Sequence, residues 1–168
     1  YHLYLQPGLD VIEKFGGFAP FMKWDGPTIT DSGGYQVSFL WLPDKDSGEV
    51  RPVKITDEGA WFTSHIDGTK HFLTPEKSME IQKVLGADII MAFDQPLGSD
   101  YSDKKKKEAF ARTLKWEERS FNHWKKIKST QSLFGIIQGD LDKDLRKASL
   151  DFILNLGFPG LAMGGESI

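Results

Sequence analysis

The second half of the sequence alternates between short apolar runs and longer amphipathic stretches, and this alternation limits the folds that the chain can adopt. Apolar runs at 87–94, 133–139 and 160–165 are typical of strands that are covered on both faces. Between them lie helical patterns, one starting near Ser102 and one over 142–156. Strands that are joined through helices pair in parallel. The sequence therefore predicts an α/β fold built on a parallel sheet, in a single domain over 1–168.

The first half of the chain carries shorter signals. The elements predicted there are a strand end at 1–5, a helix at 8–16, a short strand at 27–30, a turn-rich stretch at 41–58, and a hairpin around Asp67-Gly68. A further helix begins after Thr74, with Pro75 at its first position, and stops at Gly86.

Polar or flexible residues follow four of these strands directly. They are Asp31, Asp94, Gln138 and the pair Gly164-Gly165. Because the carboxyl ends of parallel strands share one edge, which carries the active site in α/β folds, we expect these residues to converge.

This set of groups matches the edge of a planar, amide-bearing ring. A carboxylate accepts hydrogen bonds from ring N–H groups, a glutamine amide donates to a ring carbonyl, and a glycine N–H can approach closely. Tyr35 could cover the flat face by stacking. The predicted ligand is a purine-like base, with a second carboxylate free for nucleophilic or acid–base work.

Each residue also has a structural interpretation when taken alone. Asp31 could hold the amides of the turn at 32–34, Asp94 could simply end a strand, and Tyr35 could belong to the core. Double glycines such as Gly164-Gly165 usually mark turns. The functional hypothesis depends on their joint placement at one end of the sheet.

Other classes of site have weaker support. His65, Asp67 and His71 flank the predicted hairpin, where surface positions are a better interpretation than a metal site, and the chain contains no cysteine. The four lysines at 104–107 are interpreted as a solvated helix face, with a phosphate contact as the less favoured interpretation. The net charge of −3 is not that of a typical nucleic-acid-binding domain, and no apolar run approaches the roughly 20 residues that span a bilayer. A cytoplasmic location is expected because no signal segment opens the chain.

Several motifs resemble, in order and spacing, those of the tRNA-guanine transglycosylases, or queuine tRNA-ribosyltransferases. They are "YHLYLQPG", "WDGPTITDSGGYQV", "FTSHIDGTKHFLTPEKSMEIQ", "GADIIMAFDQ", "FGIIQGD" and "GFPGLAMGGES". The resemblance covers nearly the whole chain, and "DSGGYQ" is closest to the bacterial queuosine branch. One departure is Gln95-Pro96, where the bacterial pattern usually has Glu and Cys.

The resemblance implies a (β/α)8 TIM-type barrel enzyme that exchanges guanine for a 7-deazaguanine, preQ1 or queuine, at the wobble position of tRNA with a GUN-type anticodon. It implies that Asp31 is the general acid/base, that Ser32 lies beside it in the pocket, and that Tyr35 stacks on the base. The groups implied to read the purine edge are Asp94, Gln138 and the Gly164-Gly165 segment. The family's nucleophilic aspartate and its structural zinc ligands would lie beyond Ile168, and the intact protein would form a homodimer.

On this basis the chain is expected to be an internal piece that holds about five of the eight barrel strands and has no transferase activity by itself. Two alternatives stay open. One is a non-catalytic transglycosylase-like subunit or an inactive truncated product. The other is a different α/β-barrel enzyme, such as an aldolase, although no lysine follows a predicted strand as Schiff-base chemistry requires.

Overall fold

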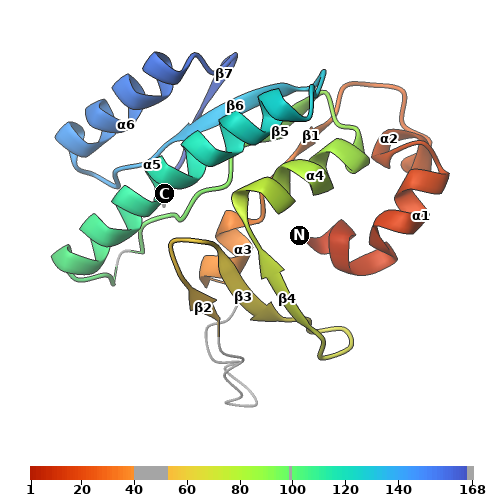
Figure 1. Ribbon diagram of the computed structural model, residues 1–168, viewed down its shortest axis with the longest axis horizontal. Coiled ribbons are helices and arrows are strands. Elements are labelled where there is room, and N and C mark those ends of the chain that lie inside the picture. The colour runs from red at the N-terminus through yellow and green to blue at the C-terminus, as the bar shows by residue number, and fades with distance from the viewer. Residues whose placement is uncertain (40–52, 99, 166–168) are drawn as a thin grey trace.

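A computed structural model of the chain describes residues 1–39, 53–98 and 100–165 (Figure 1). Most of the predicted turn-rich stretch at 41–58 therefore lies outside the described residues. In the described part of the chain, no helix is both long and apolar enough to cross a membrane.

Four strands form a parallel sheet in the order β1-β5-β6-β7. Their bounds are β1 Ile29–Thr30, β5 Ile89–Met91, β6 Ser132–Ile137 and β7 Gly160–Met163. Ile90 pairs with Leu133, and Phe134 pairs with Gly160, in parallel register. The predicted α/β fold with a parallel sheet is thus confirmed, and each strand is shorter than the apolar run that predicted it.

Three long helices accompany this sheet. They are α4 (Pro75–Leu85), α5 (Asp103–Lys126) and α6 (Lys143–Leu156). Thr74, Ser102 and Asp142 cap their N-termini by accepting hydrogen bonds from backbone N–H groups of the first turn. Gly86 and Gly157 end α4 and α6 in the left-handed conformation that glycine adopts without strain. The predicted helix limits are confirmed here to within one residue.

A second, antiparallel sheet lies apart from the parallel one in the view of Figure 1. It contains β2 (Lys54–Ile55), β3 (Ala60–Thr63) and β4 (Lys70–Leu73). Thr63 pairs with Lys70, and Gly68 adopts φ 74° in the turn between them. This confirms the predicted hairpin around Asp67-Gly68.

The strand predicted at 1–5 is wrong, because the backbone there is helical. The N-terminal elements are η1 (Tyr4–Gly8), with Gln6 extended inside it, α1 (Leu9–Lys14) and α2 (Phe18–Met22). The Tyr4 hydroxyl lies 2.9 Å from Nδ1 of His71 on β4. The apolar residues of this segment pack against the core cluster that includes Phe62 and Leu73 of the hairpin.

The core links the two sheets through α5. The ring of Trp116 on α5 is fully buried and stacks on Phe93, with ring centroids 4.6 Å apart. The same cluster includes Phe62 of β3 and Leu73 of β4. Because α5 also packs against α4 and β6, it connects the hairpin to the carboxyl ends of the parallel strands.

Candidate active site

A cavity of about 680 Å³ opens at the carboxyl ends of the parallel strands. The sequence-predicted residues that line it are Asp31, Tyr35, Asp94, Gln138, Gly164 and Gly165. Ser32 is buried beside the cavity, within hydrogen-bond range of Asp94. The fold therefore brings all seven predicted site residues together from β1, α3 (Gly34–Phe39), β5, β6 and β7.

Asp94 and Gln138 form a buried polar pair at the base of the site. Gln138 Nε2 donates to Asp94 Oδ2 at 2.7 Å, and Ser32 Oγ donates to Asp94 Oδ1 at 3.5 Å. Burial raises the pKa of Asp94 to about 7; the hydrogen bond from Gln138 opposes this rise, while the charge of Asp31 adds to it. Asp94 is thus poised to change charge near neutral pH.

Gln138 carries an unused acceptor. Its Oε1 atom is buried and has no hydrogen-bond partner among the described residues. A buried amide oxygen without a partner costs free energy, so this atom is suited to accept from a donor on a bound ligand.

Asp31 and Ser32 shape the turn that follows β1. Asp31 Oδ1 accepts from the Ser32 N–H at 2.8 Å, and Ser32 Oγ accepts from the Gly34 N–H at 3.2 Å. Asp31 is exposed to the cavity, whereas Ser32 is buried. The carboxylate of Asp31 therefore both holds the turn and remains accessible to a ligand.

Glycines allow the backbone to approach the polar pair closely. A Cβ atom on Gly34 would overlap the carbonyl oxygen of Asp94, and one on Gly164 would lie 2.6 Å from Gln138 Nε2. Gly165 has φ 74°, and a Cβ there would lie 2.6 Å from Gln138 Oε1. All three glycines are therefore required by space, and Gly165 also by its left-handed backbone conformation.

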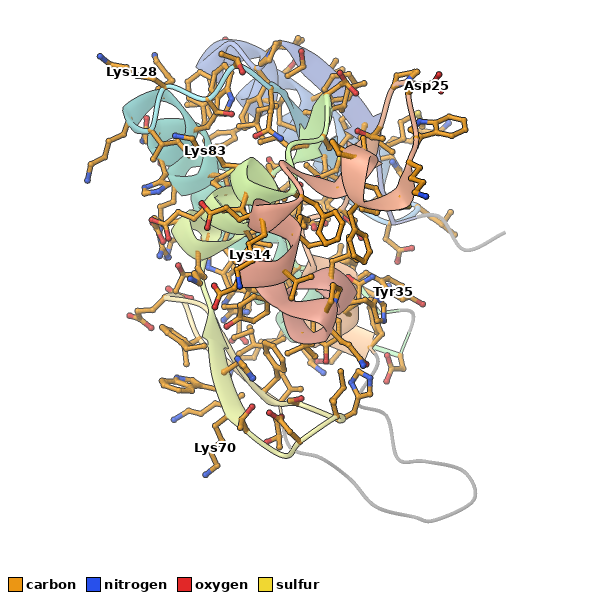
Figure 2. All side chains as sticks on the ribbon, turned by 90° about the vertical axis from the view of Figure 1, so that its right-hand side faces the viewer. Lys14, Asp25, Tyr35, Lys70, Lys83 and Lys128 are labelled. Carbon is orange, nitrogen blue, oxygen red and sulfur yellow. The ribbon has the colours of Figure 1, made fainter. Side chains whose placement is uncertain are left out.

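Tyr35 projects from the first turn of α3, a helix that the sequence did not predict. Its side chain is 54% exposed, and its ring centroid lies 5.1 Å from that of Phe39. Figure 2 shows the ring at the edge of the molecule. Tyr35 thus lines the cavity instead of filling the core.

The lining of the cavity also contains residues that the sequence reasoning missed. Tyr101 and Lys105 line the cavity, with Lys105 Nζ 3.6 Å from the Tyr101 ring centroid. Lys106 pairs with Asp140 at 2.7 Å. The lysine run was interpreted as a solvated face, and only the helix start at Ser102, directly after a strand-end loop, could have placed it near the site.

His71 of the hairpin makes hydrogen bonds to its neighbours. His71 contacts the Tyr4 hydroxyl through Nδ1 and Thr69 Oγ1 through Nε2, and Asp67 accepts from Thr69. In the ranges that the structure describes, no group of three or more His, Cys, Asp or Glu side chains could hold a metal ion.

Comparison with known proteins places the whole chain in one family. The model of the family "Queuine tRNA-ribosyltransferase" matches residues 1–168. The chain is 48% identical over 168 residues to the queuine tRNA-ribosyltransferase of Psychrobacter cryohalolentis and 50% identical over 170 residues to that of Staphylococcus haemolyticus. All of this chain is covered in both comparisons, and it spans 42% of the length of each relative. The resemblance inferred from the motifs is confirmed: the chain belongs to the queuine tRNA-ribosyltransferase family.

Proposed function

We propose that the protein carrying these residues is a tRNA-guanine transglycosylase, and that this part of it recognises the base that is exchanged. The observation that carries the proposal is the buried Asp94–Gln138 pair with its open acceptor, Gln138 Oε1. An acceptor carboxylate beside an amide is the chemistry that a guanine-like edge requires. The substrates would be tRNA with a GUN-type anticodon and a 7-deazaguanine, preQ1 or queuine.

The other residues of the site take roles that follow from their positions. Asp31, accessible at the end of β1, is the general acid/base, and Ser32 holds the turn beside it. Tyr35 stacks on the flat face of the base, and the Gly164-Gly165 segment contributes backbone contacts to its edge. In the reaction an aspartate outside these residues attacks the ribose C1′ and releases guanine; the incoming base then displaces that aspartate.

The proposal extends to the architecture of the protein. The four parallel strands and their helices form part of a (β/α)8 barrel, with residues 1–168 in its single catalytic domain. A structural zinc ion would be bound by residues outside this chain, which contains no cysteine. The intact protein would act as a cytoplasmic homodimer.

Incorporation of labelled guanine into tRNA by the intact protein tests the proposed activity. Wild-type protein should incorporate label into tRNA with a GUN-type anticodon and should leave a tRNA without that anticodon unlabelled. Asp31→Asn should reduce the rate at least 100-fold, given the usual 10²–10⁴-fold contribution of acid–base catalysis. Base binding without any incorporation would instead support a non-catalytic subunit.

A further inference from the structure

The regular hydrogen-bonded pairing of β5 with β6 ends next to Asp94 and Gln138, the residues of the proposed base site. The Ala92 N–H donates to the Phe134 carbonyl at 2.9 Å. In a continuing parallel ladder, the N–H of Ile136 would next donate to the Ala92 carbonyl. It donates instead to Oε1 of Glu117 on α5, at 2.7 Å. A side chain from the helix thus takes the place of a strand carbonyl.

Glu117 is completely buried, which is unusual for a glutamate on a helix. Its relative exposure is 0%, and its Oε2 atom has no hydrogen-bond partner within the described ranges. Burial raises the pKa of Glu117 well above its ordinary value, and the nearby charge of Asp94 adds to that rise. A neutral carboxyl offers the Ile136 N–H the same kind of carbonyl oxygen that a neighbouring strand would offer.

The same face of α5 supports the backbone on both sides of Asp94. Ser120 Oγ accepts from the Phe93 N–H at 3.1 Å, and Thr113 Oγ1 accepts from the Gln95 N–H at 3.0 Å. Residues 113, 117 and 120 are spaced by one helical turn each, so they form one polar stripe. This stripe replaces the missing strand pairing where the cavity opens.

The separation of the strands also sets the geometry of the polar pair. Beyond Ile136, the Gln138 N–H donates to Ser149 Oγ on α6 at 3.1 Å, while the Gln138 side chain reaches Asp94. If β5 and β6 continued as a regular ladder, their backbones would lie about 4.8 Å apart. Glu117 occupies the position of the next ladder bond, because its Oε1 accepts from the Ile136 N–H.

We propose that Glu117 is a positioning residue of the base site: its carboxyl oxygen holds β6 away from β5 and thereby fixes the distance across which Gln138 meets Asp94. This inference rests on the proposed base-recognition function. Glu117 itself is buried beneath the strands and does not line the cavity.

Two conservative substitutions in the intact protein test the role. Glu117→Gln keeps a carbonyl oxygen at the same reach, so its affinity for guanine should stay within about twofold of wild type. Glu117→Asp withdraws the oxygen by one methylene and should weaken guanine binding about tenfold, the equivalent of about 1.4 kcal/mol. Glu118→Asp makes the same change at an exposed neighbour and should have no effect. Isothermal titration calorimetry with guanine measures all three, with the melting temperature as the check on folding.

Equal weakening by Glu117→Gln and Glu117→Asp would overturn the proposal, as would a Glu117→Asp variant that melts earlier but binds guanine normally. If wild-type protein bound no guanine, the proposed function would fail. The positioning role would then be decided by hydrogen exchange at the Ile136 amide. Exchange of this amide should be faster in Glu117→Asp than in wild type, and unchanged in Glu117→Gln and Glu118→Asp. If Glu117→Asp left the exchange rate unchanged, the positioning role would be refuted.

Discussion

Gln138 Nε2 donates to Asp94 Oδ2 across the gap between two neighbouring parallel strands, at 2.7 Å. This contact orients both side chains before any ligand arrives. It also leaves Asp94 with its second oxygen facing the Ser32 hydroxyl, at the longer distance of 3.5 Å. A ligand that enters the cavity therefore meets a preformed pair, and little ordering free energy is needed to complete the site.

Replacing Asp94 with asparagine should weaken base binding while preserving its contact with Gln138. The amide oxygen can still accept from Gln138, but the charge is lost and an N–H donor replaces an acceptor. Hydrogen bonds to charged groups contribute about 1.5–3 kcal/mol, so we expect about 10- to 100-fold weaker binding of guanine. Titration calorimetry measures this, with the exposed Asp151→Asn on α6 as control. Binding within twofold of wild type would contradict the assigned role.

Base affinity should depend on pH through Asp94. Its pKa is raised to about 7, mainly by burial, so the acceptor carboxylate is depleted below that pH. Affinity for guanine should therefore rise as pH increases through about 7 and level off above it. Binding measured between pH 5.5 and 8.5 should lose this dependence in Asp94→Asn. An identical pH profile in that variant would assign the dependence to another group.

The free energy of unfolding should fall over a pH range in which the affinity for guanine rises. The pKa of Asp94 is higher in the folded state than the value of about 3.9 for an unfolded chain. Between these values the folded state binds more protons, so the free energy of unfolding falls as pH rises from about 4 to about 7. Urea denaturation at several pH values should show a smaller fall in Asp94→Asn. Part of the fall should persist, because the pKa of buried Glu117 is raised as well.

Gly34→Ala should damage the site through a single methyl group. The new Cβ would overlap the Asp94 carbonyl oxygen and lie 2.5 Å from Asp94 Oδ1. We expect a loss of about 1–3 kcal/mol in stability from overpacking, with guanine binding reduced more than tenfold. Gly68→Ala is the control, since it strains a turn at φ 74° but meets no atom within 4 Å. A Gly34→Ala protein that binds normally would show that the turn can relax.

Tyr35 should contribute through its ring and not its hydroxyl. Stacking of a base on an aromatic side chain contributes about 1–3 kcal/mol, so Tyr35→Ala should weaken guanine binding about tenfold or more. Tyr35→Phe should bind within about twofold of wild type. Because the side chain is 54% exposed, neither change should greatly alter the melting temperature. If Tyr35→Ala and Tyr35→Phe lost the same affinity for guanine, the hydroxyl and not the ring would be the group that contributes to binding.

Prediction from sequence was most successful where local chemistry determines structure. The starts of α4, α5 and α6 follow from the capping residues Thr74, Ser102 and Asp142, and the ends of α4 and α6 follow from Gly86 and Gly157. The hairpin follows from Asp67-Gly68. The convergence of Asp94 and Gln138 could be inferred because parallel strands share an edge, so two strand-end positions sufficed to bring the side chains together.

Other structural features that depend on distant contacts were not predicted. Residues 1–5 were predicted to be the end of a strand, but they are helical and pack against the hairpin. Helix α3, which presents Tyr35, was also missed. Glu117 looks like an ordinary polar residue of a charged helix, because its partner, the Ile136 N–H, lies 19 residues further along the chain on another element.

The polar pair and its neighbours come from segments that are far apart along the chain: Asp94 lies 44 residues from Gln138 and 62 from Ser32. Such contacts close large loops, and the entropy of loop closure is lost before the contacts form. We therefore expect the site to assemble late during folding, after the local hairpin and the individual helices. A ligand that binds only the finished site would then act on the protein's lifetime: it would slow unfolding and leave the rate of folding nearly unchanged.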